Sequence, residues 1–330
     1  MKIVIAGANG FLGRAAGRHL LEAGHEVVGL VRHAGGVAPG VREVAWDGAT
    51  AGAWASELED AGALINLAGR SVNCRYSARH RAEILASRVD STRILGDAIA
   101  LCRRGPELWI NASTATVYRH AEDRPQGEYG GDIGEGFSVQ VALAWEKAFF
   151  GARVPGKVRK VALRTSLVLG REKGTVFDYF WKIARYGLGG KMGGGRQMVS
   201  WIHAEDFCRL LEWVLRREDV EGILNVAAPG AVPNREFMAT MRAAAGRRVG
   251  LPAARWMLEI GAWALRSESE LLLKSRWVAP VRLENEGFRF RWPALPAAIA
   301  DLAPAPKAAV AASPEKRPAD RMKTLSRHVS

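Results

Sequence analysis

Short aliphatic runs alternate with longer amphipathic stretches through the first half of the chain. The aliphatic runs predict strands at Lys2–Ala6, Glu26–Val31, Val41–Ala45, Ala63–Asn66, Glu107–Asn111 and Val158–Arg164. Between several of them, apolar residues recur at helical spacing, which predicts helices at Phe11–Ala23, Arg79–Leu101 and Val139–Phe150. Strands that alternate with helices form parallel βαβ units with right-handed crossovers. The pattern therefore predicts an α/β fold with a doubly wound parallel sheet.

Beyond about Gly170 the pattern changes. A glycine-rich stretch at Gly187–Gly195 is followed by a predicted helix at Ala204–Arg216 and a short predicted strand at Ile223–Val226. The segments after this strand are mostly helical in pattern. We expect residues 1–170 to form the main domain, to which later segments can return, and residues 171–302 to form a smaller, mostly helical substrate subdomain. Residues 303–330 are rich in Ala, Pro and Lys and lack a periodic apolar face, so we expect a disordered basic tail.

The turn after the first strand has the sequence GANGFLG, from Gly7 to Gly13. A strand runs into it and an amphipathic helix leaves it, which is the context of a Rossmann-type dinucleotide-binding turn. There, Gly7 permits the tight bend, Gly10 lets the backbone approach a pyrophosphate, and Gly13 lets the helix pack closely on the strand. Phe11 and Leu12 begin the helix whose N–H groups bind the phosphates. A glycine-rich turn without a ligand is the alternative interpretation.

The end of the second strand indicates which cofactor is preferred. An NAD-specific protein places Asp or Glu there to bind the adenosine ribose, but this chain has no carboxylate at that point. Arg32 stands there instead, and a guanidinium matches the geometry of a 2′-phosphate. We therefore expect NADP, with NAD less favoured. The alternative is an ordinary solvated loop arginine.

Composition and charge narrow the classes of partner. Apolar residues make up 48% and charged residues 25%, which is ordinary for a soluble globular protein. The net charge of +13 suits either a solvated basic surface or a positive cleft for phosphates. Because no nucleic-acid-binding motif accompanies the charge, we expect no nucleic-acid partner. The oligomeric state stays open.

Cysteine usage and hydropathy bear on the compartment. Cys74, Cys102 and Cys208 are scattered, so they predict neither a disulfide framework nor a metal site, and they favour a reducing environment. The chain shows no signal-peptide pattern and no apolar run of about 18 residues that could span a bilayer. We expect a soluble, cytoplasmic protein without membrane association.

Several further motifs resemble the extended short-chain dehydrogenase/reductase superfamily. Within it, the chain is similar to a group of uncharacterised NAD-dependent epimerase/dehydratase proteins, named as sugar-nucleotide epimerases, that carry a C-terminal domain of unknown function. The resemblance covers roughly residues 1–302. Its motifs are Gly7–Gly13, Ile65–Gly69, Ser87–Val89, Ala144–Glu146, Leu163–Gly170, Gly189–His203, Asn225–Pro229, Val278–Pro280 and Gly287–Phe290.

The resemblance implies roles for residues around the cofactor. Those expected to lie near its ribose, phosphates or nicotinamide are Ala68, Gly69, Arg88, Arg164, Thr165 and Val168. A hydroxyl from Ser113 or Thr114 would bind the reacting oxygen. The spacing to Tyr118 favours Thr114, while the serine pattern of the family favours Ser113. Without the resemblance, such a pair after a strand is typical of a turn or a cap.

The catalytic Tyr-x-x-x-Lys motif of the superfamily is absent. Its spacing would place both side chains on one helix face, where the ammonium lowers the pKa of the phenol. No tyrosine of this chain is followed by lysine four residues later. In the resembling family a cysteine often replaces the lysine. Counting from Trp145 and Glu146, that position is Ala142 here, and the tyrosine position is Ser138.

Candidates on the substrate side come from the glycine-rich stretch and the helix after it. Lys191 and Arg196 are cations that could hold a phosphate or carboxylate of a small polar substrate. His203 is a candidate general acid, although a structural, hydrogen-bonded histidine is the commoner case. Asp206 in a first helical turn is more readily explained by the helix dipole. No metal-ligand spacing occurs.

Two functions follow from this pattern. The first is an NADP(H)-dependent oxidoreductase, or an epimerase-like or dehydratase enzyme, that acts on a carbonyl or hydroxyl of a polar small molecule. The second is a non-catalytic NADP-binding redox sensor or scaffold, which would keep the glycine loop and lose the tyrosine and lysine.

Overall fold

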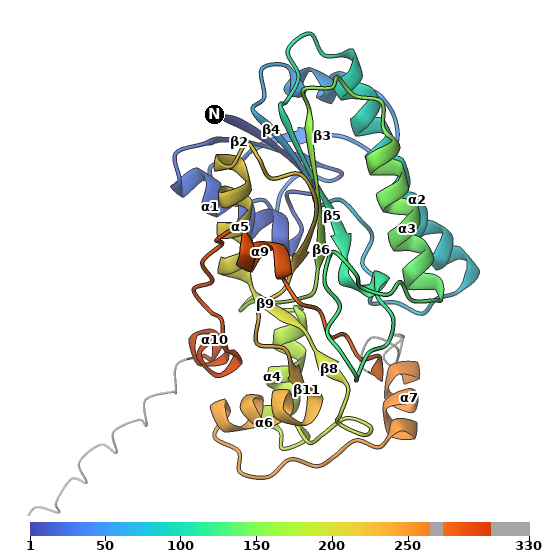
Figure 1. The fold of residues 1–330 in the computed structure, drawn as a ribbon, viewed down its shortest axis with the longest axis vertical. Coiled ribbons are helices and arrows are strands. Elements are labelled where there is room, and N and C mark those ends of the chain that lie inside the picture. The colour runs from blue at the N-terminus through green and yellow to red at the C-terminus, as the bar shows by residue number, and fades with distance from the viewer. Residues whose placement is uncertain (265–272, 305–330) are drawn as a thin grey trace, which may run out of the picture.

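The structure is a computed structural model that describes residues 1–264 and 273–304. Its centre is a seven-stranded sheet of order β10-β6-β5-β4-β1-β2-β3, in which every neighbouring pair is parallel (Figure 1). The strands are β1 (Lys2–Ala6), β2 (Glu26–Val31), β3 (Arg42–Ala45), β4 (Ala63–Asn66), β5 (Leu108–Thr114), β6 (Arg159–Thr165) and β10 (Gly222–Val226). The predicted doubly wound, Rossmann-type sheet is confirmed.

Helices cover both faces of this sheet. Helices α1 (Phe11–Glu22) and α5 (Ala204–Arg216) pack together on one face, and α2 (Ala78–Leu101) and α3 (Phe137–Gly151) pack together on the other. Successive side chains of a strand point to opposite faces of the sheet, so each strand contributes to the apolar core on both sides. In β1, Ile3 and Ile5 join the cluster that contains α1 and α5, while Val4 and Ala6 join the cluster that contains α2.

The segments after residue 170 do not all belong to the subdomain. Strand β10 is the edge strand of the main sheet next to β6, and α5 packs on α1. Strand β10, whose last three residues Leu224–Val226 are all buried, pairs in parallel with the edge of β6. All but one of the predicted boundaries agree with the observed ones to within two residues, and many coincide. The exception is β5, which extends to Thr114, three residues beyond its predicted end.

The subdomain begins at the carboxyl edge of the sheet, because only one residue separates the end of β6 from the start of β7 (Leu167–Leu169). Strand β7 pairs with β9 (Trp201–His203), and β8 (Met198–Val199) pairs with β11 (Val232–Pro233). Strands β8, β9 and β11 lie in the region expected to be mostly helical, whereas β7 lies within residues 1–170. Around them are α4 (Val176–Arg185), α6 (Asn234–Ala244), α7 (Arg255–Ala264) and α10 (Leu295–Leu302). Helix α9 (Val281–Asn285) instead packs beside β10.

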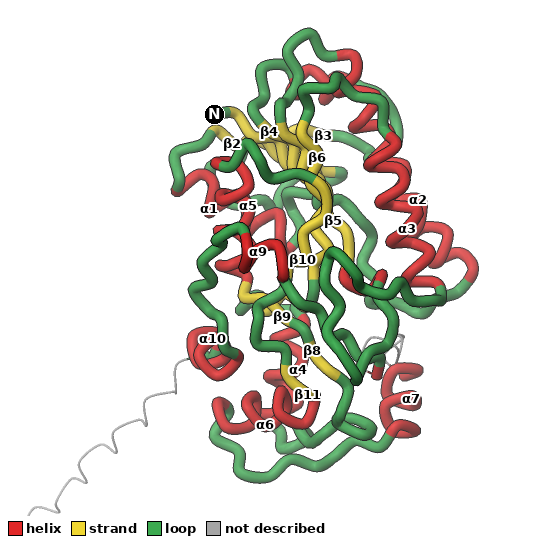
Figure 2. Tube along the Cα trace, viewed as in Figure 1, coloured by secondary structure: helices red, strands yellow, loops and turns green. Residues whose placement is uncertain are grey.

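Loops connect the sheet to the subdomain, as Figure 2 shows in green. The subdomain has an apolar core of its own, built mainly from α4, α6 and α10. Of the tail expected to be disordered, residues 305–330 lie outside the described residues. No helix in the described part of the chain combines the length and the apolarity needed to cross a bilayer.

Candidate functional site

The glycine turn between β1 and α1 has the geometry that a pyrophosphate site requires. Gly7 has φ +79°, a left-handed conformation, and a Cβ there would come within 3.0 Å of the Ala68 backbone. A Cβ on Gly13 would come within 2.6 Å of the Ala8 Cα, so only glycine lets α1 pack this closely on β1. Gly10 is the N-cap of α1, and no side chain caps this helix. Its first N–H groups are therefore not satisfied by a capping side chain.

Phe11 and Leu12, the first residues of α1, use their side chains for packing. The ring of Phe11 lies so close to Gly170 that a Cβ there would come within 2.7 Å of a ring carbon. Leu12 packs against the core between α1 and α5. What these two residues can offer a phosphate is therefore their backbone N–H groups.

Arg32 follows β2 directly and its side chain is exposed. Trp46 follows the neighbouring strand β3, and its backbone N–H donates to the carbonyl of Val31, the residue before Arg32, at 3.1 Å. Among the described residues no carboxylate forms an ion pair with Arg32, so its guanidinium can accept an anionic ligand.

A buried amide network holds the loop that follows β4. The side-chain oxygen of Asn66 accepts a hydrogen bond from the Ala68 N–H at 3.1 Å, and its Nδ2 donates to Asn111 Oδ1 at 2.7 Å. Asn66 Nδ2 also donates to Thr92 Oγ1 at 3.2 Å, and the indole N–H of Trp145 donates to the same hydroxyl at 2.9 Å. The network connects β4, β5, α2 and α3, and so fixes the loop against the glycine turn.

Arg88 on α2 lies at the same loop. A Cβ on Gly69 would be 3.3 Å from the guanidinium carbon, and the guanidinium lies 5.2 Å from the centre of the Trp145 ring. Its NH1 donates to the carbonyls of Arg70 and Ile84 at 3.1 and 3.0 Å. Burial lowers the pKa of Arg88 to about 10, so it is still a cation at neutral pH.

Ser113 and Thr114, at the end of β5, differ in what their hydroxyls can do. The Ser113 hydroxyl is buried and donates to Glu146 Oε1 at 2.6 Å. The Thr114 side chain is half-buried, and its hydroxyl accepts the N–H of Thr116 at 3.2 Å as the cap of a short 3₁₀ turn. The geometry therefore leaves Thr114 as the more accessible of the two hydroxyls.

Arg164 on β6 was expected near the nicotinamide. Its side chain is buried and paired with other side chains of the protein. Its Nε and NH2 donate to the two oxygens of Glu146, each at 2.8 Å, and its NH1 donates to the Tyr118 hydroxyl at 3.0 Å. Although burial disfavours the charge, the hydrogen bonds to Glu146 hold the pKa of Arg164 above its usual value. Tyr118 donates to Asn225 Oδ1 at 2.8 Å, and burial raises the pKa of its phenol.

Thr165 and Val168 lie where β6 passes into β7. The Thr165 hydroxyl is half-buried and donates to the carbonyl of Leu163 at 3.1 Å. Val168 pairs with Ile202 in the β7–β9 ladder and packs against the core on the α1 side. Both residues are therefore at the carboxyl edge of the sheet, where ligands bind in open α/β folds.

The two positions on α3 that correspond to the missing pair lie one turn apart. Ala142 is fully buried in a small cluster with Tyr118 and Val278. Ser138 is half-buried. Neither side chain supplies a cation, and the alanine has no proton to transfer.

The substrate-side candidates lie in the subdomain. Lys191 is exposed, and no ion pair involves it within the described residues. Arg196 is also exposed and donates to Glu122 Oε2 at 3.3 Å, which ties the glycine-rich stretch to the loop before α3. The structure does not bring either cation into contact with Ser113, Thr114 or the glycine turn.

His203 is the N-cap of α5. Its Nδ1 accepts the N–H of Glu205 at 3.1 Å, and its Nε2 lies 3.3 Å from a carboxylate oxygen of Asp301. The ring packs against Trp292 with centres 5.1 Å apart. Burial lowers the pKa of His203, which favours a neutral ring that accepts from the backbone. This geometry favours a structural role over general acid catalysis.

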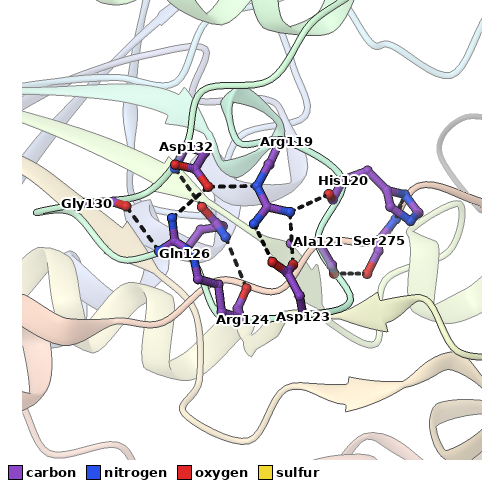
Figure 3. A network of polar contacts seen from close by, with 9 residues as sticks. All are labelled: Arg119, His120, Ala121, Asp123, Arg124, Gln126, Gly130, Asp132 and Ser275. Atoms are coloured by element: carbon purple, nitrogen blue, oxygen red, sulfur yellow. Dashed lines mark hydrogen bonds and ion pairs between the residues drawn. The ribbon is translucent and has the colours of Figure 1, made fainter.

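The loop that leads into α3 is fixed by an ion-pair network, which sequence reasoning missed (Figure 3). Arg119 donates through Nε to Asp132 at 2.8 Å and through NH1 and NH2 to Asp123 at 2.9 and 2.8 Å. His120 Nδ1 accepts the N–H of Ser275 at 3.0 Å, which joins the loop to the C-terminal region. These contacts give the start of α3 a defined position relative to the subdomain.

Glu146 is the other residue that sequence reasoning missed as a site member. It stands in the Ala-Trp-Glu motif, and the available signal was a glutamate in a largely apolar predicted helix; the structure shows that its side chain is buried. Metal binding has no support in the part of the chain that the structure describes, where no group of three or more His, Cys, Asp or Glu could hold an ion.

The parallel sheet and the uncapped helix after its glycine turn define a Rossmann-type dinucleotide-binding protein. The chain matches the NAD dependent epimerase/dehydratase family over residues 3–227, and a domain of unknown function, DUF1731, over residues 253–302. The chain therefore belongs to the NAD dependent epimerase/dehydratase family. This confirms the resemblance seen in the sequence motifs.

Relatives match over nearly the whole chain. The human epimerase family protein SDR39U1 is 32% identical over 92% of this chain and 99% of its own length. Epimerase family protein YfhF of Bacillus subtilis is 30% identical over 92% of this chain and 98% of its own length. A crystal structure of human SDR39U1 isoform 2 with NADPH superposes with a TM-score of 0.81, at 31% identity over 92% of this chain and 99% of that one.

Proposed function

We propose that this protein binds NADP(H) at the carboxyl edge of its sheet and uses it in an oxidoreductase or epimerase-like reaction on a small polar substrate. The observation that carries the proposal is the uncapped α1 N-terminus beside the turn from Gly7 to Gly13. A homologue that matches 92% of this chain and has the same fold has been crystallised with NADPH, which supports the choice of cofactor.

The residues around the glycine turn fit this cofactor. The N–H groups at the start of α1 would bind the pyrophosphate, and Ala68 and Gly69 would lie against a ribose. Arg32, exposed and without an ion-pair partner in the described chain, would bind the 2′-phosphate. When bound, the nicotinamide supplies or accepts hydride.

The reacting oxygen of the substrate would be held by Thr114. The hydroxyl of Ser113 is already committed to Glu146 at 2.6 Å, so it is a positioning group for the end of β5. Lys191, whose ammonium is exposed in the subdomain, would hold an anionic group of the substrate. His203 would contribute by capping α5.

A non-catalytic NADP-binding sensor is the second candidate. The observation that favours it is the pair Ser138 and Ala142 on α3, which cannot provide the proton transfer of the superfamily. Both candidates share the cofactor site, and a cytoplasmic location is part of the proposal. Three free thiols, Cys74, Cys102 and Cys208, support a reducing compartment.

The cofactor proposal is tested by calorimetric titration of the protein with NADPH and with NADH. NADPH should bind more tightly, and Arg32→Ala should weaken NADPH binding by about tenfold or more, because a charge-assisted hydrogen bond is worth about 1.5–3 kcal/mol. The same change should leave NADH binding nearly unaltered. Arg248→Ala, at an exposed arginine in the subdomain, is the matched control. Equal affinities for the two cofactors would refute the preference for NADP.

A further inference from the structure

The side chain of Arg14 runs back along α1 to the glycine turn. Arg14 is the fourth residue of this helix, and its NH1 donates to the carbonyl of Asn9, the residue before the N-cap Gly10. Long side chains on a helix lean toward its N-terminus, so this direction is the one that helix geometry favours. The contact places the guanidinium beside the same end of α1 whose N–H groups have no capping side chain.

A carboxylate from the subdomain holds the guanidinium in this place. Nε of Arg14 donates to Glu172 Oε2 at 3.2 Å, and NH2 donates to the same oxygen. Glu172 lies in the turn between β7 and α4, which the Thr175 hydroxyl fixes through hydrogen bonds to the carbonyls of Gly170 and Glu172 at 2.9 and 2.7 Å. The ring of Phe11 packs on Gly170 in the same turn. The ion pair therefore joins the glycine turn to the start of the subdomain.

This ion pair keeps hydrogen-bonding capacity for a further anion. The side chains of Arg14 and Glu172 are 33% and 29% exposed, so a ligand from solvent can reach them. A guanidinium has five N–H groups, and three of those on Arg14 donate in the contacts above. The other two, one on NH1 and one on NH2, make no hydrogen bond to the described residues. They can donate to a phosphate oxygen while the bonds to Glu172 stay in place.

We propose that Arg14 binds the pyrophosphate of the cofactor and that Glu172 shares the guanidinium with it. The proposal rests on the proposed NADP(H)-binding function and adds a side chain to the N–H groups at the start of α1. In the free protein, Glu172 holds the guanidinium at the turn. When the cofactor binds, the negative charge of Glu172 repels the phosphates and lowers the affinity. Because Glu172 belongs to the subdomain, the position of its turn adjusts the strength of cofactor binding.

The first test is calorimetric titration of the protein with NADPH and with NADH. Arg14→Met should weaken both by the same factor, about tenfold, because the pyrophosphate is common to the two cofactors. Arg14→Lys, which keeps the charge, should recover most of the affinity. The matched control is Arg216→Met, since Arg216 also pairs with a glutamate but lies at the last residue of α5. A loss confined to NADPH, or no loss in Arg14→Met, would overturn the proposal.

The second test separates phosphate binding from a purely structural tie. Glu172→Gln keeps an acceptor oxygen for Arg14 but removes the negative charge, so both cofactors should bind several-fold more tightly. A tie that only positions the turn would instead leave affinity unchanged or weaken it in parallel with Arg14→Met, and that result would refute the proposal. Failure of the wild type to bind either cofactor would refute the proposed function as well, whereas wild-type binding that ignores Arg14 would refute this proposal alone.

Discussion

Replacing Glu146 with alanine removes the carboxylate from a buried ion pair. Glu146 accepts three hydrogen bonds, from Ser113 at 2.6 Å and from two nitrogens of Arg164 at 2.8 Å each. The two charged side chains are 9% and 8% exposed, so water cannot replace the lost carboxylate without rearrangement. Breaking a buried pair by removing one partner costs about 3–5 kcal/mol, because it leaves an uncompensated charge.

The assay is denaturant unfolding followed by circular dichroism, with melting temperature as a second measure. The free energy of unfolding should fall by about 3–5 kcal/mol, which corresponds to a drop in Tm of roughly 4–7 °C for a protein of 330 residues. The double variant Glu146→Leu with Arg164→Met should be less destabilised than Glu146→Ala, because neither charge is then left alone.

The control is an exposed ion pair. Arg255 and Glu259 pair at 3.0 Å with side chains that are 79% and 51% exposed, so Glu259→Gln should change stability by less than about 1 kcal/mol. The reasoning would be refuted if Glu146→Ala lost no more stability than Glu259→Gln, or if the double variant lost as much as the sum of its single changes.

Three further predictions concern the glycine turn and two buried titratable groups. Gly13→Ala should destabilise the protein by about 1–3 kcal/mol and abolish cofactor binding, because its Cβ would overlap Ala8. Gly10→Ala is the control: its Cβ would lie 3.3 Å from the Gly7 carbonyl oxygen, so this variant should unfold nearly as the wild type does. Equal stability of the two variants in denaturant would contradict this prediction. Burial raises the pKa of Glu128, so its contribution to stability is present at acid pH and is lost as pH rises from the unfolded value through the folded one. Glu128→Gln should therefore be more stable than wild type at neutral pH and not at acid pH in the same unfolding assay, and an unchanged difference across pH would count against it. Burial lowers the pKa of His203, so the free energy of unfolding should fall as pH drops below the unfolded pKa of 6.5. His203→Asn keeps a capping side chain and should flatten this dependence of stability on pH. A dependence identical to that of the wild type would show that another group is responsible.

The parts of the fold that could be predicted are those with strong local signals. The aliphatic runs of β1 and β4 are fully or almost fully buried strands, and such runs have few alternatives. The glycines at 7 and 13 were interpretable because their roles are steric and local, one in a left-handed conformation and one at a close helix–strand contact. The order of strands in the sheet and its β10 edge depend instead on contacts between distant segments.

The candidate site was only partly predictable for the same reason. Arg164 lies in a recognisable motif, but its pairing with Glu146, 18 residues earlier in the sequence, depends on how α3 packs against β6. Arg88 lies in the Ser87–Val89 motif, but its contacts with Gly69 and Trp145 depend on how α2 packs against α3 and the loop after β4. His203 looked like a candidate acid because its residue type is common in active sites, and its capping contact is visible only in three dimensions.

The central claim is that the turn from Gly7 to Gly13 holds NADP(H) with its 2′-phosphate at Arg32. A crystal structure of the protein grown with NADPH tests it most directly. The account predicts a pyrophosphate at the N-terminus of α1, the 2′-phosphate within hydrogen-bond distance of Arg32, and open, polar space beside nicotinamide C4 that Thr114 can reach. A glycine turn without nucleotide at saturating NADPH would contradict the central claim, and a filled space beside C4 would contradict the enzymatic part of it.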